Sequence, residues 1–224
     1  MNFKQSLLLV ALSWCFVTNV FAQRPSYRIE SGYGITVGAA SYNINTDAFE
    51  TTTGIGVTGG LHVKGGIEHR WYDVSFGIQF YDNNFKVTGT DISDNSETDI
   101  EYKLQAVQFF FLGHYKIARD HLYIDFGPSI QINDKLKLKN KSQEEILVNG
   151  LTDVTANEIR EVSGFNVNLL LGFTAGSRSL KFRGQYQFGV NNILDKLNGK
   201  GLDPDEDKFK GRQGILSGSV IFYF

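Results

Sequence analysis

Apolar and polar residues alternate along most of this chain in segments of about ten residues. The segment 180–190 shows the pattern most clearly. Successive side chains of a β-strand point to opposite faces, so such a segment forms a strand with one apolar face and one polar face. Its apolar parity holds Leu180, Phe182, Tyr186, Phe188 and Val190, and its polar parity holds Lys181, Arg183, Gln185 and Gln187.

The same alternation predicts about eight strands. They cover 27–41, 55–67, 74–81, a part of 100–117, 122–132, 164–173, 180–190 and 214–224. The long polar stretches 43–53, 82–99, 134–160 and 191–213 alternate with the short turns 68–73, 118–121 and 175–179. This order predicts an all-β, antiparallel, up-and-down transmembrane β-barrel with four long extracellular loops and short periplasmic turns.

The last strand, Gly214 to Phe224, ends on an apolar edge. Val220, Phe222 and Phe224 share one parity, and Ser217 and Ser219 share the other. An exposed edge of this kind invites aggregation, which barrel closure prevents. A buried closing strand in a soluble sandwich remains an alternative on this stretch alone.

The polar parity of the predicted strands carries charged residues, which distinguishes the fold from soluble barrels. A lipocalin-like barrel would have an apolar lumen and a polar exterior. Charges on the inner face fit a narrow hydrated lumen better than a sandwich core, where each would need a buried partner. We expect a cluster of ion pairs near the periplasmic rim, with Glu30 and Asp125 accepting hydrogen bonds. The predicted cluster is Arg28, Glu30, Lys64, Asp125, Lys181 and Arg183.

The first 22 residues are typical of a secretory signal peptide. One charge, Lys4, precedes an apolar run from 7 to 17, and Ala22 precedes Gln23. The run is too short for a helical membrane anchor. A lipoprotein signal is disfavoured because Trp14 precedes Cys15, where a small residue is needed. We therefore expect a signal peptide over 1–22 and one barrel domain over 23–224, which would hold no cysteine.

Composition supports strands over helices. The chain has 24 Gly, 18 Phe and 10 Tyr against 3 Pro and one Met, and its formal net charge is −2. Glycine and aromatic residues at this frequency favour a β-rich protein, and the near-neutral charge argues against a nucleic-acid partner.

No motif for catalysis, cofactor binding or metal binding stands out. His69 and His121 fall in predicted turns. His62 and His114 face the predicted lumen, where each could be a general base. We expect neither to have a nearby Ser or acid in a nucleophile arrangement, and we expect both to form hydrogen bonds in the lumen. The acidic residues 203–207 lack the spacing of an EF-hand loop. A barrel hydrolase acting on lipid or peptide stays as the alternative, and a Ser or an acid beside His62 or His114 would favour it. A porin is disfavoured, because eight strands enclose only enough space for side chains.

The chain resembles the PorT-like outer-membrane β-barrels of Bacteroidota, in the size range of OmpX. The resemblance rests on the junction Phe21-Ala22-Gln23, the stretch 189–193, the strand and turn spacing, and the terminal Tyr223-Phe224. The C-terminal strand also resembles the signal that the barrel-assembly machinery recognises. These resemblances imply an outer-membrane location, contact with outer-membrane lipid and, for some family members, a role in secretion or gliding assemblies. We therefore expect a non-enzymatic barrel that acts through its extracellular loops or as a component of an envelope assembly, with an envelope protein or an extracellular ligand bound at the loops.

Overall fold

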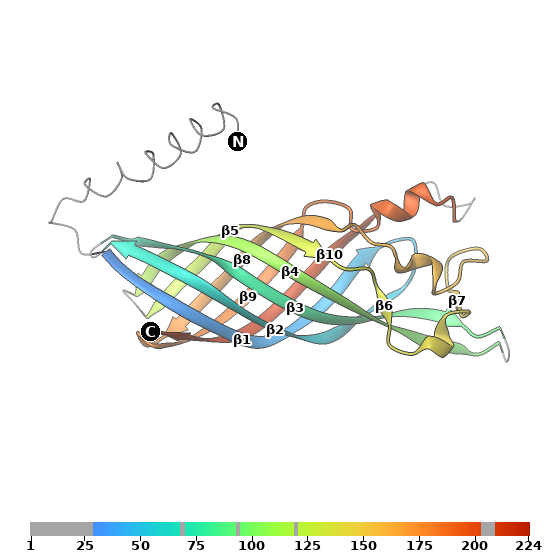
Figure 1. Ribbon diagram of the computed structural model, residues 1–224, viewed down its shortest axis with the longest axis horizontal. Helices are drawn as coiled ribbons and strands as arrows, with labels where there is room; N and C mark the ends of the chain where they lie inside the picture. Colours follow the sequence, from blue (N-terminus) through green and yellow to red (C-terminus); the bar gives the residue numbers. More distant parts are fainter. Residues whose placement is uncertain (1–28, 68–69, 93–94, 119–120, 203–208) are drawn as a thin grey trace, which may run out of the picture.

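Eight long strands form the wall of a closed barrel in the computed structural model, which describes residues 29–67, 70–92, 95–118, 121–202 and 209–224 (Figure 1). Each strand pairs with its neighbour along the chain, and all pairs are antiparallel. The strands are β1 (Ile29–Thr46), β2 (Thr51–Ile67), β3 (Tyr72–Thr90), β4 (Glu97–Ala118), β5 (Leu122–Asn133), β8 (Phe165–Gly176), β9 (Leu180–Gly189) and β10 (Gly211–Tyr223).

The last strand closes the barrel on the first. β10 pairs with β1 from Gly34 opposite Tyr223 to Thr46 opposite Gly211. The pairing leaves the ring without an open edge, as the sequence predicts for its apolar C-terminal strand. The predicted all-β barrel of eight antiparallel strands is confirmed.

The outer wall is apolar and the inner wall polar. Phe222 and Phe224 are exposed on the outside, whereas Ser217 and Ser219 are buried inside. On β4, where the sequence is apolar on both parities, Phe109 faces outward. This arrangement is opposite to that of a lipocalin, so the soluble alternatives are wrong.

The short turns mark the periplasmic end of the barrel. Trp71 and Tyr72 lie there on the outer surface, next to Tyr115 of β4. The ring centroids of Trp71 and Tyr115 are 5.6 Å apart. Exposed aromatic rings at this level are typical of the interfacial belt of a membrane barrel.

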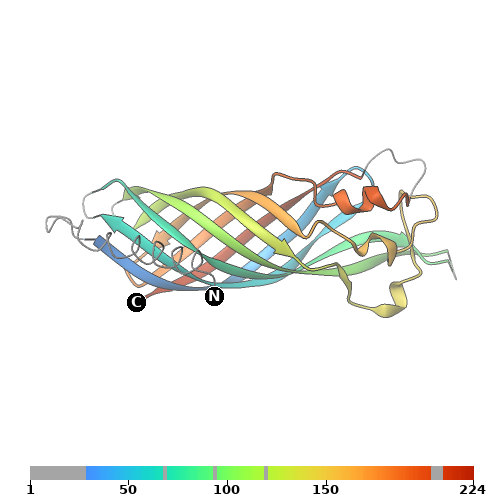
Figure 2. The same cartoon turned by 45° about the horizontal axis from the view of Figure 1, so that its top comes forward.

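The strands extend further at the outer end than predicted. The proposed loop 43–53 is reduced to the residues between β1 and β2, because β1 continues to Thr46 and β2 begins at Thr51. The proposed loop 82–99 is largely a hairpin, since β3 and β4 stay paired up to Thr90 opposite Glu97. In both views this hairpin extends beyond the rest of the wall (Figures 1 and 2). Polar side chains concealed these extensions because strands outside the membrane need no apolar face toward lipid.

Short elements gather at the outer end. They are β6 (Lys137–Leu138), η1 (Lys141–Gln143), β7 (Leu147–Val148), η2 (Glu158–Arg160) and η3 (Asp195–Gly199). β6 pairs with β4 and β7 pairs with β3. These two pairings fold the stretch 134–160 back onto the outer hairpin.

Within the described residues, no helix is long and apolar enough to span a membrane.

Pro128 lies at an interruption of the ladder between β4 and β5. The β4–β5 pairs run to Phe110 opposite Ser129 and resume at Gly113 opposite Phe126. No pair forms between these two, because proline has no backbone N–H to donate. Pro128 points outward, so the break leaves the inner wall undisturbed.

Candidate functional site

Charged side chains fill the periplasmic half of the lumen, and Asp73 is the first of two centres. Its carboxylate lies 2.7 Å from Lys64 Nζ and 2.9 Å from Lys116 Nζ. The three residues come from adjacent ends of β2, β3 and β4, which the barrel brings together at the short-turn rim. The Asp73 side chain is buried, so both ion pairs are shielded from bulk water.

Asp125 is the second centre. Its Oδ1 lies 2.6 Å from His114 Nδ1, and its Oδ2 lies 3.4 Å from Arg183 Nε and accepts a hydrogen bond from Thr174. Four strands, β4, β5, β8 and β9, contribute to this centre. The carboxylate has no exposed surface, and these partners compensate its burial.

Tyr123 joins the two centres. Its ring makes an edge contact with the ring of His114 in the Asp125 centre, at a centroid distance of 6.1 Å. Lys64 of the Asp73 centre donates a hydrogen bond to the Tyr123 hydroxyl at 3.0 Å. The ammonium groups of Lys64 and Lys181 lie 4.3 Å and 4.4 Å from the centroid of its ring. The Tyr123 ring thus stabilises two lysine ammonium groups through cation–π contacts, in addition to the ion pairs with the carboxylates.

The structure brings together four of the six residues predicted for the lumen cluster, namely Lys64, Asp125, Lys181 and Arg183. Arg28 and the side chain of Glu30 lie outside the described residues. Sequence reasoning missed other members of the network, although all of them lie on the inward parity of their strands. The missed members are Asp73, Ser75, His114, Lys116, Tyr123 and Thr174.

One expectation about the histidines is wrong. His114 has both an acid and a serine within hydrogen-bond distance, since Ser75 Oγ lies 2.7 Å from its Nε2 and Asp125 lies at its Nδ1. A carboxylate only accepts, so Nδ1 donates to Asp125 and Nε2 accepts from the Ser75 hydroxyl. This order of contacts is that of a serine hydrolase triad. However, the three side chains have exposed fractions of at most 3%, which leaves the serine inside the packed lumen.

The other histidines have structural roles where they are described. The ring nitrogens of His62 lie 2.9 Å from the Tyr223 hydroxyl and 3.3 Å from Thr36 Oγ1. His62 therefore ties β2 to the closing strand and to β1. His121 Nδ1 donates to the carbonyl of Gly176 at 3.0 Å and so links two periplasmic turns. His69 lies outside the described residues.

A layer of amide side chains fills the middle of the lumen. Gln213 Nε2 donates to Asn168 Oδ1 at 2.6 Å, and Asn168 Nδ2 donates to Gln131 Oε1 at 3.0 Å. Gln187 donates to the hydroxyl of Tyr81 on the opposite wall. Side chains from several strands thus meet across the barrel, which leaves the layer filled rather than open.

An apolar core fills the outer end and continues above the barrel wall. We call the outer parts of the strands together with residues 134–164 and 191–210, so far as these are described, the cap. Its core includes Tyr42, Ile44, Phe85, Val87, Ile100, Tyr102, Leu136, Val148, Val154, Ile159, Ile193, Leu197 and Phe209. The rings of Phe85 and Tyr102 stack at 5.5 Å, and the Tyr102 hydroxyl donates to the carbonyl of Ala156 at 2.7 Å. The long loops therefore share one hydrophobic core with the barrel.

This core corrects our expectation for the third long loop. Ile146, Leu147 and Val148 are three consecutive apolar residues in the otherwise largely polar stretch 134–160, and from the sequence we expect such residues to form a contact surface on a hairpin above the membrane. Instead Ile146 and Val148 are buried, and β7 pairs with Gly89 and Thr90. The hairpin that projects furthest is β3–β4. The apolar residues belong to the core because they have the β3–β4 hairpin to pack against.

Ion pairs stabilise the outside of the cap. Glu161 lies 3.0 Å from Lys135 Nζ and 3.8 Å from Lys200 Nζ, so it links the third and fourth loops. These lysines, with Lys135 the main contributor, lower the pKa of the Glu161 carboxyl below its usual value. The tie thus holds at neutral pH and weakens only in acid, as pH falls through the lowered pKa.

We searched the described residues for a possible metal site. There, no three His, Cys, Asp or Glu side chains gather in a way that could hold a metal ion. The acidic residues 203–207, which the sequence analysis weighed as a calcium loop, lie outside the described residues.

Together, the closed ring of eight antiparallel strands, the apolar outer wall and the polar lumen define a small outer-membrane β-barrel protein. The chain belongs to the outer membrane protein β-barrel domain family, whose sequence profile matches residues 21–195. The protein is therefore located in the outer membrane. A search of curated proteins finds no significant match.

A search of solved structures finds matches that are distant in sequence. Neisserial surface protein A is 12% identical, with a TM-score of 0.48, and the alignment covers 87% of this chain and 99% of that one. The attachment invasion locus protein Ail of Yersinia pestis is 11% identical, with a TM-score of 0.43 and coverage of 87% and 99%. OprG of Pseudomonas aeruginosa is 12% identical, with a TM-score of 0.40 and coverage of 88% and 94%.

Proposed function

We propose that this protein is a non-enzymatic outer-membrane barrel that binds an envelope protein or an extracellular ligand through its cap. The observation that carries the proposal is the shared apolar core of the long loops. Ordering these residues costs conformational entropy. A barrel that served only as a membrane anchor would not need an ordered cap. A folded cap presents a fixed surface, and loops of this length are commonly functional.

The most prominent surface of the cap is the end of the β3–β4 hairpin. Ile92 lies there, between the end of β3 at Thr90 and the start of β4 at Glu97, and its exposed fraction is 65%. The hairpin is fixed from one side by β7 at Gly89 and Thr90. An exposed large apolar side chain on a supported hairpin is a suitable anchor for a partner.

Site-specific photocrosslinking in intact cells tests the proposal. A photoreactive residue replaces Ile92 at the hairpin tip or, as a matched control, Arg178 in an exposed periplasmic turn. We expect one discrete crosslinked product from position 92 that is absent from position 178. Crosslinks to lipid alone, or the same product from both positions, would contradict binding through the cap.

Replacing residues 140–156 with a short linker, the obvious deletion test, is unsuitable. Val148, Val154 and Ala156 belong to the core, so the deletion would unfold the cap as well as remove a surface. A change at Ile92 leaves the core untouched.

The proposal includes membership in the PorT-like branch and recognition of the last strand by the barrel-assembly machinery. Phe222 and Phe224 are exposed on the outer wall and Val220 lies on the same face, which supports the second point. We expect removal of Phe224 to lower the amount of folded protein in the outer membrane, measured by heat-modifiable migration in gels. The variant Ser177→Ala, in a periplasmic turn, serves as the control.

A serine hydrolase is the second candidate function, because the chain Ser75–His114–Asp125 favours it. Its geometry is suitable, but the buried serine would have to become accessible from the periplasmic rim. A fluorophosphonate probe tests this in detergent and in liposomes. Labelling of the wild type that Ser75→Ala abolishes would establish a nucleophile. We expect no labelling, because the lumen is packed.

A further inference from the structure

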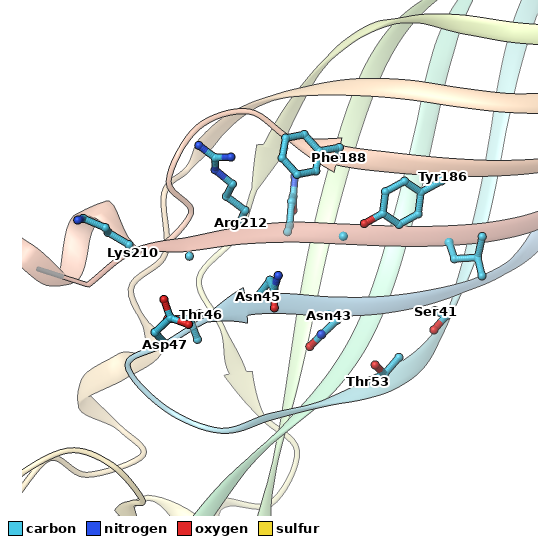
Figure 3. Close-up of a pocket in the computed structure, with 14 residues that line it drawn as sticks. Ser41, Asn43, Asn45, Thr46, Asp47, Thr53, Tyr186, Phe188, Lys210 and Arg212 are labelled. Carbon is cyan, nitrogen blue, oxygen red and sulfur yellow. The ribbon is translucent and has the colours of Figure 1, made fainter.

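A groove lies on the outer wall near the extracellular end, where β1, β10 and β9 run side by side (Figure 3). Its volume is about 660 Å³. It is separate from the lumen and from the hairpin tip. Its lining includes Asn43, Asn45, Asp47, Thr53, Tyr186, Phe188, Lys210, Arg212, Gly214 and Leu216.

Gly214 forms the floor of the groove. It pairs with Asn43 on one side and with Phe188 on the other. A Cβ at this position would lie 3.0 Å from the Tyr186 hydroxyl, so the glycine lets the end of the Tyr186 ring lie close to the wall. A larger side chain at 214 would project into the groove between the outward-facing residues of β1 and β9.

The groove spans the boundary between the lipid-facing wall and the polar cap. Along β1, outward residues change from Val37, which is exposed and apolar, to Asn43 and Asn45. Along β10 they change from Leu216, also exposed, to Arg212. The lower half of the groove thus faces acyl chains and the upper half faces lipid headgroups.

Two adjacent cations dominate the upper half. Lys210 and Arg212 are exposed, and within the described residues neither forms an ion pair. The Arg212 guanidinium lies 5.5 Å from the centroid of the Phe188 ring, which holds it against the wall. Asp47 lines the same groove, so the site offers acceptors as well as cations.

We propose that this groove binds a phosphorylated glycolipid of the outer leaflet. Lys210 and Arg212 bind the phosphate, since a guanidinium matches phosphate oxygens with paired donors. The amides of Asn43 and Asn45 and the carboxylate of Asp47 hydrogen-bond sugar hydroxyls. Tyr186 and Leu216 line the path of an acyl chain. A soluble sugar phosphate would leave this lower, apolar half unused.

Native mass spectrometry of the purified full-length protein in detergent tests the site. The probes are bisphosphorylated lipid A, its dephosphorylated form and phosphatidylglycerol. We expect bisphosphorylated lipid A to bind at least about tenfold more tightly than either of the other two. The double variant Lys210→Gln with Arg212→Gln should lose this preference, while its affinity for the dephosphorylated form stays unchanged.

Two further variants separate a site from general attraction. Lys103→Gln with Lys137→Gln removes the same charge from the β4 side of the barrel and should leave the preference intact. Gly214→Leu keeps both cations and fills the floor, so it should weaken binding of every lipid probe. Heat-modifiable migration confirms that each variant is folded.

Three results would overturn the proposal. Equal losses from both charge variants would mean diffuse attraction. Phosphatidylglycerol that binds as tightly as lipid A would mean recognition of phosphate without the sugar. Unchanged binding by Gly214→Leu would mean that the groove is not the site.

Discussion

Asp73 shows how a single residue organises the lumen. It lies one residue inside β3, yet it holds two lysines from the neighbouring strands. A buried carboxylate with two cationic partners is stable only as long as all charges are matched, because an unmatched charge in the lumen is costly.

Asp73→Asn should therefore destabilise the barrel strongly. The change leaves Lys64 and Lys116 without their carboxylate, and we expect a loss of about 3–5 kcal/mol in the free energy of unfolding. Urea unfolding in detergent, followed by tryptophan fluorescence, measures it. Asp99→Asn is the matched control, since its pair with Lys86 is exposed and should contribute less than about 1 kcal/mol. Equal effects would contradict the importance of burial.

The lipid face gives a second prediction. Leu171 lies near the middle of β8 on the outer wall, and its exposed fraction is 62%. Leu171→Arg should lower the free energy of unfolding in liposomes by about 2–4 kcal/mol, because a charge near the bilayer centre is costly. Leu171→Phe should have little effect. A tolerated arginine would mean that this face does not contact lipid.

At the residue scale, the sequence predicts which side chains face inward but not which ones pair. Alternation alone places His114, Asp125 and Arg183 in the lumen. That Ser75 reaches His114, and Asp73 reaches both Lys64 and Lys116, depends on strand register and on the narrow diameter of the barrel. Neither of these can be derived from the spacing within one strand.

The cap is the element that the sequence describes least well. Val148 and Ile159 are separated from β3 by long stretches of chain, yet they pack in the same core as Phe85 and Val87. A stretch with isolated apolar residues among polar ones has the sequence pattern of a loop. These apolar residues become part of a core only because they pack against the β3–β4 hairpin. Bringing residues so far apart in the chain together costs loop-closure entropy, and the local sequence does not show whether the packing compensates for this cost.

Ile159→Asp should unfold the cap and spare the barrel. A buried unpaired carboxylate costs several kcal/mol, and the apolar contacts of Ile159 are lost as well. Hydrogen exchange should become fast in peptides from 134–162 and stay slow in β8 and β9. Ser142→Asp, which adds the same charge at an exposed position, should change nothing. Slow exchange in the Ile159→Asp cap would show that the loops do not depend on this core.

At the scale of the whole molecule, the lumen has three filled layers. Ion pairs lie at the periplasmic end, amides such as Gln131 and Gln213 lie in the middle, and the apolar core of the cap lies at the outer end. The sequence predicts the barrel, its closure and its charged lumen, because alternation and loop lengths encode them. It does not predict that the apolar core of the cap fills the outer end of the lumen.

Conductance in planar bilayers tests most directly whether this barrel acts through its surface rather than as a pore. The purified full-length protein is inserted at neutral pH, and the reconstituted amount is confirmed by heat-modifiable migration. With three filled layers in the lumen, we expect no steady channels. Stable, porin-sized conductance steps from the wild-type protein would contradict the account.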